Sequence, residues 1–163
     1  MIHTLDLHFK DINHAIGAFV VSTSAGPVLI ETGPYSTFDT LKKAVADTGF
    51  NLAEIKHVLL THIHFDHAGA AWALAELGAK IYVHPVGYPH LAKPGKLYES
   101  AKMIYGDEMD SLWGAMNDIA EDQLISVDHE EKVIVGDHEF IALHTPGHAK
   151  HHIAWQLDNT IFT

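Results

Sequence analysis

The sequence contains no cysteine. Disulfide scaffolds, thiolate nucleophiles and every zinc site that needs sulfur are therefore excluded. Basic residues are also scarce, because 10 lysines and arginines stand against 21 aspartates and glutamates, a formal net charge of −11. Such a chain repels phosphate backbones and anionic membrane surfaces, so we expect neither a nucleic acid nor a membrane as a partner.

Long hydrophobic runs are missing as well. The uncharged stretch over residues 12–30 has nearly the length of a membrane span, but polar residues and the Gly26-Pro27 pair interrupt it. This pattern predicts a β-hairpin. Residues 1–10 lack the basic segment and the apolar run of a signal peptide, so we expect a cytoplasmic protein.

Histidine is the residue in excess, with 15 copies among 163 residues. Because thiolates are absent, imidazole and carboxylate are the strong metal ligands that the chain can offer. The length and the 47% hydrophobic content predict a single domain over residues 1–163. Strand-like and helix-like segments alternate, which indicates an α/β (α+β) fold with helices on the faces of a sheet.

The apolar pattern predicts strands over residues 2–9, 15–21, 28–31, 57–60, 79–83, 124–127, 132–135, 139–143 and 152–157, and the start of a further strand over 160–163. Helices are predicted over 37–48, with Ser36 as N-cap, and over 68–77. Residues 85–123 place apolar side chains at helical spacing, which predicts a helical insertion. This insertion either packs on the body or forms a lid, with Tyr88, Tyr105 or Trp113 lining a substrate pocket.

Four candidate metal ligands, His62, His64, Asp66 and His67, lie within six positions between a predicted buried strand and a helix. Side chains at i and i+2 of an extended chain point the same way, so His62 and His64 can bind one ion. Asp66 and His67 follow the turn of the chain and are expected to face the same cavity, with room for a second ion. Strand ends of this kind are where α/β sheets bind ligands.

A second motif, Thr145-Pro146-Gly147-His148, predicts a tight turn that leaves His148 on a loop. Together with His62 and His64, this residue would complete three imidazole ligands and leave an open position for water, as in catalytic metal sites. We expect one or two divalent ions, with zinc favoured and iron or manganese as alternatives.

These two motifs, His62-x-His64-x-Asp66-His67 and Thr-Pro-Gly-His148, resemble the metallo-β-lactamase superfamily. Residues 61–69 and 145–152 are most similar to its glyoxalase II-like hydrolase branch. The resemblance extends over essentially all residues, including Glu31-Thr32-Gly33, where the family more often has Asp-Thr-Gly. It implies an αββα sandwich with the metal site at the edge between two sheets.

The resemblance also implies how the ligands are shared. One ion would be held by His62, His64 and His148, and the other by Asp66, His67, a later bridging Asp and a final His. The last two have no match, because the bridging Asp normally follows a Gly directly after the strand that residues 160–163 resemble. We therefore assign five of the family's ligands to this sequence and expect C-terminal residues to be missing. A shortened protein that binds one ion is the alternative.

The expected chemistry follows from the ions. A divalent metal with an open position lowers the pKa of its water to about 7 and polarises a carbonyl. We expect a metal-dependent hydrolase that uses metal-activated hydroxide on a small thioester, lactone or other acyl ester, with Asp66 orienting the hydroxide. The alternatives are an iron-dependent oxidoreductase that acts on oxygen or a persulfide, and a metal-binding module without turnover. A homo-oligomer is compatible with the sequence.

Glu31 and His152 are candidate supporting residues around the ligands. Glu31 either steadies a ligand imidazole through a hydrogen bond or is a plain carboxylate at a strand end. Strand alternation lets only one of His151 and His152 face the site. The remaining histidines of the second half are predicted to lie at the surface or in loops: His84, His90, His129, His138 and His144.

Overall fold

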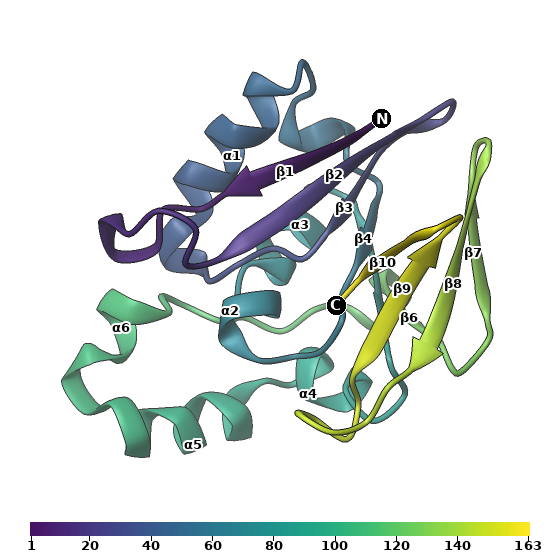
Figure 1. Cartoon of the computed structure of the whole chain (residues 1–163). Helices are drawn as coiled ribbons and strands as arrows, with labels where there is room; N and C mark the ends of the chain where they lie inside the picture. Colours follow the sequence, from purple (N-terminus) through teal and green to yellow (C-terminus); the bar gives the residue numbers. More distant parts are fainter.

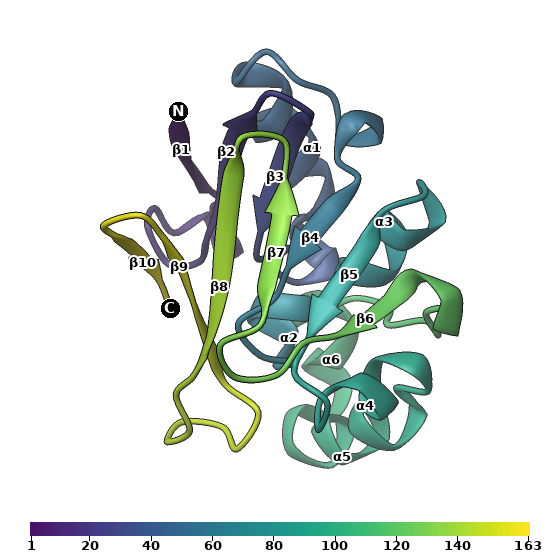
Figure 2. The same ribbon diagram turned by 90° about the vertical axis from the view of Figure 1, so that its right-hand side faces the viewer.

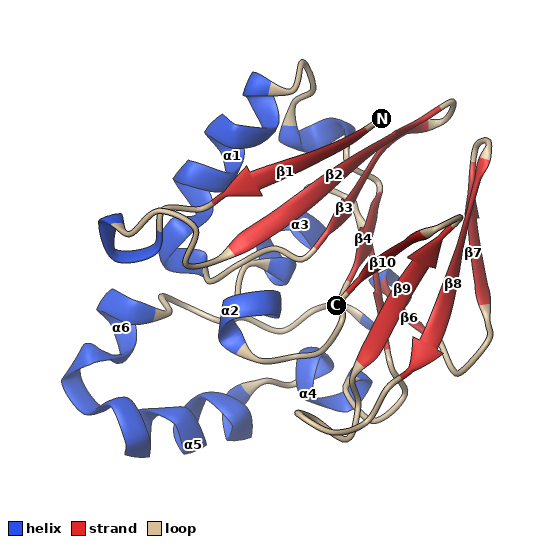
Figure 3. Ribbon diagram, in the orientation of Figure 1, coloured by secondary structure: helices blue, strands red, loops and turns tan.

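The computed structural model describes all residues 1–163, which form two β-sheets that face each other, with helices on one side and at one end (Figure 1, Figure 3). The layers run from helices through a six-stranded sheet to a four-stranded sheet. These are the first three layers of the expected αββα sandwich. Residues 1–163 place no helix on the outer face of the smaller sheet.

The larger sheet has the strand order β1-β2-β3-β4-β5-β6. Its strands are β1 (Ile2–Asp6), β2 (Gly17–Thr23), β3 (Gly26–Ile30), β4 (His57–Leu59), β5 (Lys80–Val83) and β6 (Leu124–Ser126). The first three pair antiparallel, and β3 to β6 pair in parallel. Because β4 and β5 are parallel neighbours, the loops that follow them meet at one edge of the sheet.

The smaller sheet is antiparallel throughout, with the order β10-β9-β8-β7. Its strands are β7 (Lys132–Val135), β8 (His138–His144), β9 (Ile153–Leu157) and β10 (Thr160–Phe162). One apolar core fills the space between the sheets, with Ile30 and Leu59 from one side and Phe140 and Trp155 from the other. Alternating apolar residues supply these inward faces.

Helices cover the other face of the larger sheet and its lower end in Figure 1. They are α1 (Phe38–Asp47), α2 (Phe65–Ala68), α3 (Ala71–Glu76), α4 (Tyr88–Ala92), α5 (Gly95–Tyr105) and α6 (Met109–Leu112). A core of 24 buried residues lies beneath them. Helices α4 to α6 occupy the predicted insertion over residues 85–123. No helix is both long and apolar enough to cross a membrane.

Two local predictions about the helices were wrong. Ser36 does not cap α1, because its hydroxyl donates to the carbonyl of Leu112 and Thr37 occupies the N-cap position. The helix predicted over 68–77 is divided into α2 and α3 at Gly69. A Cβ at Gly69 would lie 2.5 Å from the carbonyl oxygen of Phe65 and 2.9 Å from the Cα of Pro34. Gly69 permits this close approach, and the helix breaks at Ala70, whose φ is −100° and whose N–H donates to the carbonyl of Gly33 at 3.0 Å.

A buried tryptophan links the two sheets next to the histidine motif. The Nε1–H of Trp155 donates to the carbonyl oxygen of Leu60 at 2.9 Å, and the side chain of Trp155 is fully buried. Trp155→Phe keeps an aromatic ring, smaller than the indole, but leaves that carbonyl without its donor. We expect this variant to lower the free energy of unfolding by about 1 to 3 kcal/mol, as measured by urea denaturation. A change below about 0.5 kcal/mol would mean that water replaces the indole.

Candidate metal centre

The edge at which β4 ends brings both sequence motifs together. Leu60, Thr61 and His62 follow β4 directly, and the peptide N–H of Ile153 at the start of β9 donates to the carbonyl of Thr61 at 2.8 Å. This bond joins the larger sheet to the smaller one. Because His148 lies in the loop between β8 and β9, the same junction places it opposite the first motif.

Three imidazoles converge at this junction. His62 Nε2 lies 3.1 Å from His64 Nδ1, and His64 Nδ1 lies 3.1 Å from His148 Nε2. Ligand atoms of the three residues all lie within 4.8 Å of one another. His62 is buried and His148 is exposed, so the group is fixed on one side and open to solvent on the other.

The donor set fits a divalent metal ion. Nitrogens at about 2.0 to 2.1 Å from a tetrahedral zinc are roughly 3.3 Å apart, close to the spacing found here. The hydroxyl of Thr61 lies 2.9 Å from His62 Nδ1. When this hydroxyl accepts the Nδ1–H, the Nε2 lone pair of His62 faces the other two rings. Neutral imidazoles whose lone pairs converge, with no carboxylate between them, form a site that would bind a cation.

Asp66 and His67 form a second pair beside the first group. His67 Nε2 lies 3.2 Å from Asp66 Oδ2, and the ring of His67 lies 4.0 Å from that of His62, centroid to centroid. The other ring nitrogen, Nδ1, donates to Glu31 Oε2 at 2.8 Å. The atoms of His67 and Asp66 that face one another are therefore the ones that a second ion would use.

Glu31 is the point where this pair is anchored to the sheet. It is 4% exposed, and its second oxygen, Oε1, accepts the peptide N–H of Thr61 at 2.7 Å. Its backbone has a φ of 65°, in the left-handed region that favours glycine. The sequence left two roles open for Glu31. The structure shows the first of them, a hydrogen bond to the imidazole of His67.

The protonation states separate the two groups. Burial, and next the positive charge of His67, lower the pKa of His62 to about 2, and burial also lowers the pKa of His64. Burial alone would lower the pKa of His67 too, but hydrogen bonds to Asp66 and Glu31 raise it to about 10. Without a metal, the structure therefore holds His62 and His64 neutral and His67 charged.

Both histidines after the loop lie near the centre, so the prediction that only one of them would face it was wrong. The ring centroids of His151 and His152 are 6.3 and 5.3 Å from that of His62. Strand alternation does not apply, because β9 starts only at Ile153. His151 Nε2 accepts the peptide N–H of Ile63, and His152 Nδ1 is bonded to the hydroxyl of Thr145.

The three predicted pocket residues lie in two places. Trp113 packs against Tyr105 and Phe65, with ring centroids 5.3 and 6.1 Å away. Tyr88 instead packs on the main core beneath the helices, and its hydroxyl donates to the carbonyl of Glu121. The structure thus brings Tyr105 and Trp113 to the residue beside His64 but does not join Tyr88 to them.

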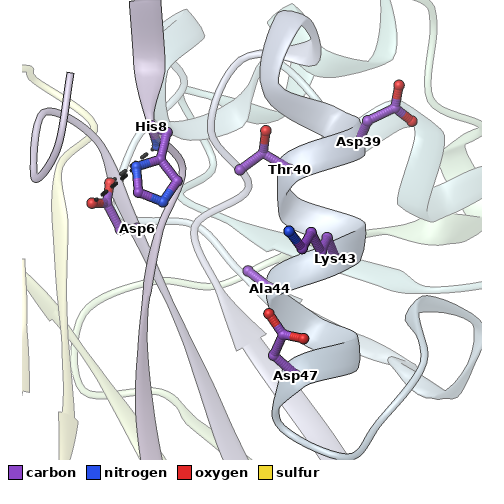
Figure 4. Close-up of a pocket in the computed structure, with 7 residues that line it drawn as sticks. All are labelled: Asp6, His8, Asp39, Thr40, Lys43, Ala44 and Asp47. Atoms are coloured by element: carbon purple, nitrogen blue, oxygen red, sulfur yellow. Dashed lines mark hydrogen bonds and ion pairs between the residues drawn. The ribbon is translucent and has the colours of Figure 1, made fainter. Parts of the chain in front are cut away.

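Two cavities differ in what they offer. One of about 200 Å³ is lined by Glu31, Asp66 and His67, together with residues from the start of β2 and with Thr163. A larger one of about 410 Å³ lies between the end of β1 and helix α1 (Figure 4). Its lining includes Asp6, His8 and Lys43 but none of the five predicted ligands, so the larger cavity is separate from the candidate centre.

Comparisons with known proteins agree with this geometry. The model of the metallo-beta-lactamase superfamily matches residues 16–163. A metallo-beta-lactamase fold-containing protein of Sulfurisphaera tokodaii is 31% identical over 127 residues, 76% of this chain and 48% of that protein. A cytoplasmic hydroxyacylglutathione hydrolase of Arabidopsis thaliana is 29% identical over 130 residues, 78% of this chain and 39% of that protein.

A solved structure matches the fold. The native FEZ-1 metallo-beta-lactamase from Legionella gormanii superposes with a TM-score of 0.71 at 22% identity, over 96% of this chain and 54% of that one. The chain thus spans about half, or less, of the length of these relatives.

Proposed function

Because the chain belongs to the metallo-beta-lactamase superfamily, we propose that it forms the metal centre of a hydrolase that acts on a small acyl substrate, a thioester, lactone or other acyl ester. The observation that carries the proposal is the convergence of His62 Nε2, His64 Nδ1 and His148 Nε2 within 4.8 Å. Zinc is the ion that this nitrogen set suits best, and iron and manganese are alternatives.

The protein residues have distinct tasks in this proposal. A divalent ion bound by the three imidazoles supplies Lewis-acid polarisation of the acyl carbonyl and hydroxide at neutral pH. Thr61 and Glu31 keep a proton on Nδ1 of His62 and of His67, so that Nε2 of each ring is the nitrogen that would bind an ion, with His67 losing its second proton on binding. Asp66 orients the attacking water and accepts a hydrogen bond from it. Burial raises the pKa of Asp66, but the hydrogen bond from His67 and the charge of His67 together with smaller contributions lower it overall, which keeps this carboxylate ionised.

Two observations favour a small acyl substrate over a nucleic acid. The net charge of −11 opposes the approach of a nucleic acid, and the Arabidopsis relative is named as a hydrolase of an acylglutathione. A glyoxalase II-like reaction, a second ion at Asp66 and His67, and a cytoplasmic location belong to the same proposal.

Removal of the metal provides the test. We expect the purified protein to bind about one zinc ion tightly and to hydrolyse at least one member of a panel of thioesters and lactones. Dialysis against a chelator should reduce the rate to that of the uncatalysed reaction, and added zinc should restore it. Metal content is measured by mass spectrometry and hydrolysis by release of the thiol or acid. Hydrolysis that survives complete metal removal would refute the proposal.

A further inference from the structure

A second pair of histidines lies near the candidate centre. His84 directly follows β5 of the larger sheet, and His144 is the last residue of β8 in the smaller sheet. The ends of both strands lie at the lower end of the molecule in Figure 2. The two rings are 4.4 Å apart, centroid to centroid, with an angle of 30° between their planes. His84 lies in a loop, one of the two predicted locations, and it is buried there, with 6% of its surface exposed.

Hydrogen bonds fix the tautomer of each ring. The peptide N–H of Val86 donates to His84 Nδ1 at 3.1 Å, so the proton of the neutral ring is on Nε2. His144 Nε2 lies 2.8 Å from the carbonyl oxygen of Lys150 and must donate to it, which leaves a lone pair on Nδ1. The pair therefore presents one free donor, His84 Nε2–H, and one free acceptor, His144 Nδ1.

Neither free nitrogen is sealed inside the protein. Trp113 Nε1 is the one side-chain nitrogen or oxygen that is fully buried without a partner. His84 Nε2 and His144 Nδ1 have no protein partner either, so each reaches the surface beside a ring that is otherwise largely covered. A donor on a buried ring is satisfied only by water or by a ligand.

The pair is connected to the metal centre through His151. The ring centroid of His151 lies 6.1 Å from that of His64. Burial, together with the neighbouring imidazoles of His64 and His84, lowers the pKa of His151 to about 4. His151 is thus a neighbour of the candidate ligand His64, and the imidazole of His84 also acts on it.

The composition limits which side chains other than histidine could bind a polar substrate group next to His84 and His144. All ten residues counted as lysine or arginine are lysines, so a guanidinium group is not available. Imidazole is the abundant polar group at this end of the sheets.

We propose that His84 and His144 form a recognition pair for a substrate group that accepts one hydrogen bond and donates another, a hydroxyl or an amide on the acyl chain. His84 Nε2–H donates to the oxygen of this group, and the O–H or N–H of the group donates to His144 Nδ1. An alkyl chain offers neither bond, and a carboxylate offers no donor. This inference rests on the proposed hydrolase function and adds the substrate feature that the site selects.

Three thioesters of one thiol test the pair: butanoyl, 3-hydroxybutanoyl and N-acetylglycyl. We expect kcat/KM to be about tenfold higher for a polar acyl group than for butanoyl, because two net hydrogen bonds are gained. The two polar substrates distinguish a hydroxyl from an amide as the preferred group. In His84→Phe the preference should fall to about one. His84→Gln keeps a donor and should retain part of the preference, and His138→Phe should retain all of it.

A second readout does not depend on turnover. In nitrogen NMR spectra of the imidazoles, we expect His84 and His144 both to carry their proton on Nε2. Addition of 3-hydroxybutanoate or N-acetylglycine, but not butanoate, should shift the signals of both rings. Equal kcat/KM for all three thioesters, or a preference that survives in His84→Phe, would overturn the inference while leaving the hydrolase proposal intact. If the protein hydrolyses none of the three, the NMR titration decides the pair by itself, and rings that do not respond overturn it.

Discussion

Replacement of His148 with alanine is expected to release the bound metal ion and to lower hydrolysis by more than about 100-fold. Loss of a residue that only supports a ligand costs about 10- to 100-fold in metal affinity or activity, and loss of one of three ligands should cost more. His148 is exposed and lies on a loop, so its removal creates no cavity in the core. Metal content and kcat/KM, measured together, report the effect.

Two further variants separate metal binding from folding. His62→Ala should lose the metal to the same extent, but it also removes a ring that is 2% exposed and should lower the melting temperature, which His148→Ala should not. His138→Ala, which changes a histidine of the smaller sheet away from the centre, should keep both metal and activity. Unchanged zinc content in His148→Ala would refute the three-histidine site.

Replacement of Glu31 with glutamine is expected to lower activity and the affinity for a second ion by about 10- to 100-fold. The carboxylate of Glu31 accepts from both Thr61 N–H and His67 Nδ1–H, so Nδ1 of His67 keeps its proton and Nε2 is the nitrogen that would give up its proton to a metal ion. An amide has one acceptor and one donor end. In either orientation, the amide of the Glu31→Gln variant would turn a donor towards one of these two N–H groups.

The control for Glu31→Gln is Glu76→Gln, because Glu76 is an exposed carboxylate at the end of α3. The control should change neither metal affinity nor activity. The outcome is read by isothermal titration with zinc and by kcat/KM. If Glu31→Gln binds a second zinc ion as tightly as the parent does, the carboxylate does not set the tautomer of His67.

Asp66 and Glu31 together give the metal-free protein a pH dependence through the pKa of His67. The pKa of His67 is raised to about 10, so its contribution to stability is complete below an unfolded pKa of about 6.5 and is lost as the pH rises towards 10. His62 has the opposite sign, because its pKa is lowered to about 2, and it destabilises the fold only below about pH 6.5. Between about pH 7 and 10 the parent should therefore lose stability with rising pH, and Glu31→Gln should lose less. Urea denaturation across this range provides the measurement.

The order of strands and helices was largely readable from the apolar pattern. The parallel core over β3 to β6 follows from strands separated by helices, and the hairpin of β2 and β3 follows from the turn residues between them. The break at Gly69 was not readable, since an alanine-rich segment favours a continuous helix. It depends on the hydrogen bond from the Ala70 N–H to the carbonyl of Gly33, which is distant in sequence.

Supporting contacts around the candidate ligands show the same limit. The sequence left the role of Glu31 open. It did not predict that His84 is buried or that His144 packs against it. Glu31 bonds a residue 36 positions away, and the rings of His84 and His144 meet across two sheets. A local pattern carries no information about contacts over such distances.

The sequence by itself determined which residue types can bind a metal, because ligand chemistry belongs to the side chain and the spacing of His62, His64, Asp66 and His67 is local. Only the tertiary structure decided which of their nitrogens carry lone pairs. Tautomer and charge depend on partner atoms such as Glu31 Oε2 and Thr61 Oγ1 and on burial. The approach of His148 to His64, across 84 positions of sequence, depends on the packing of the two sheets against each other.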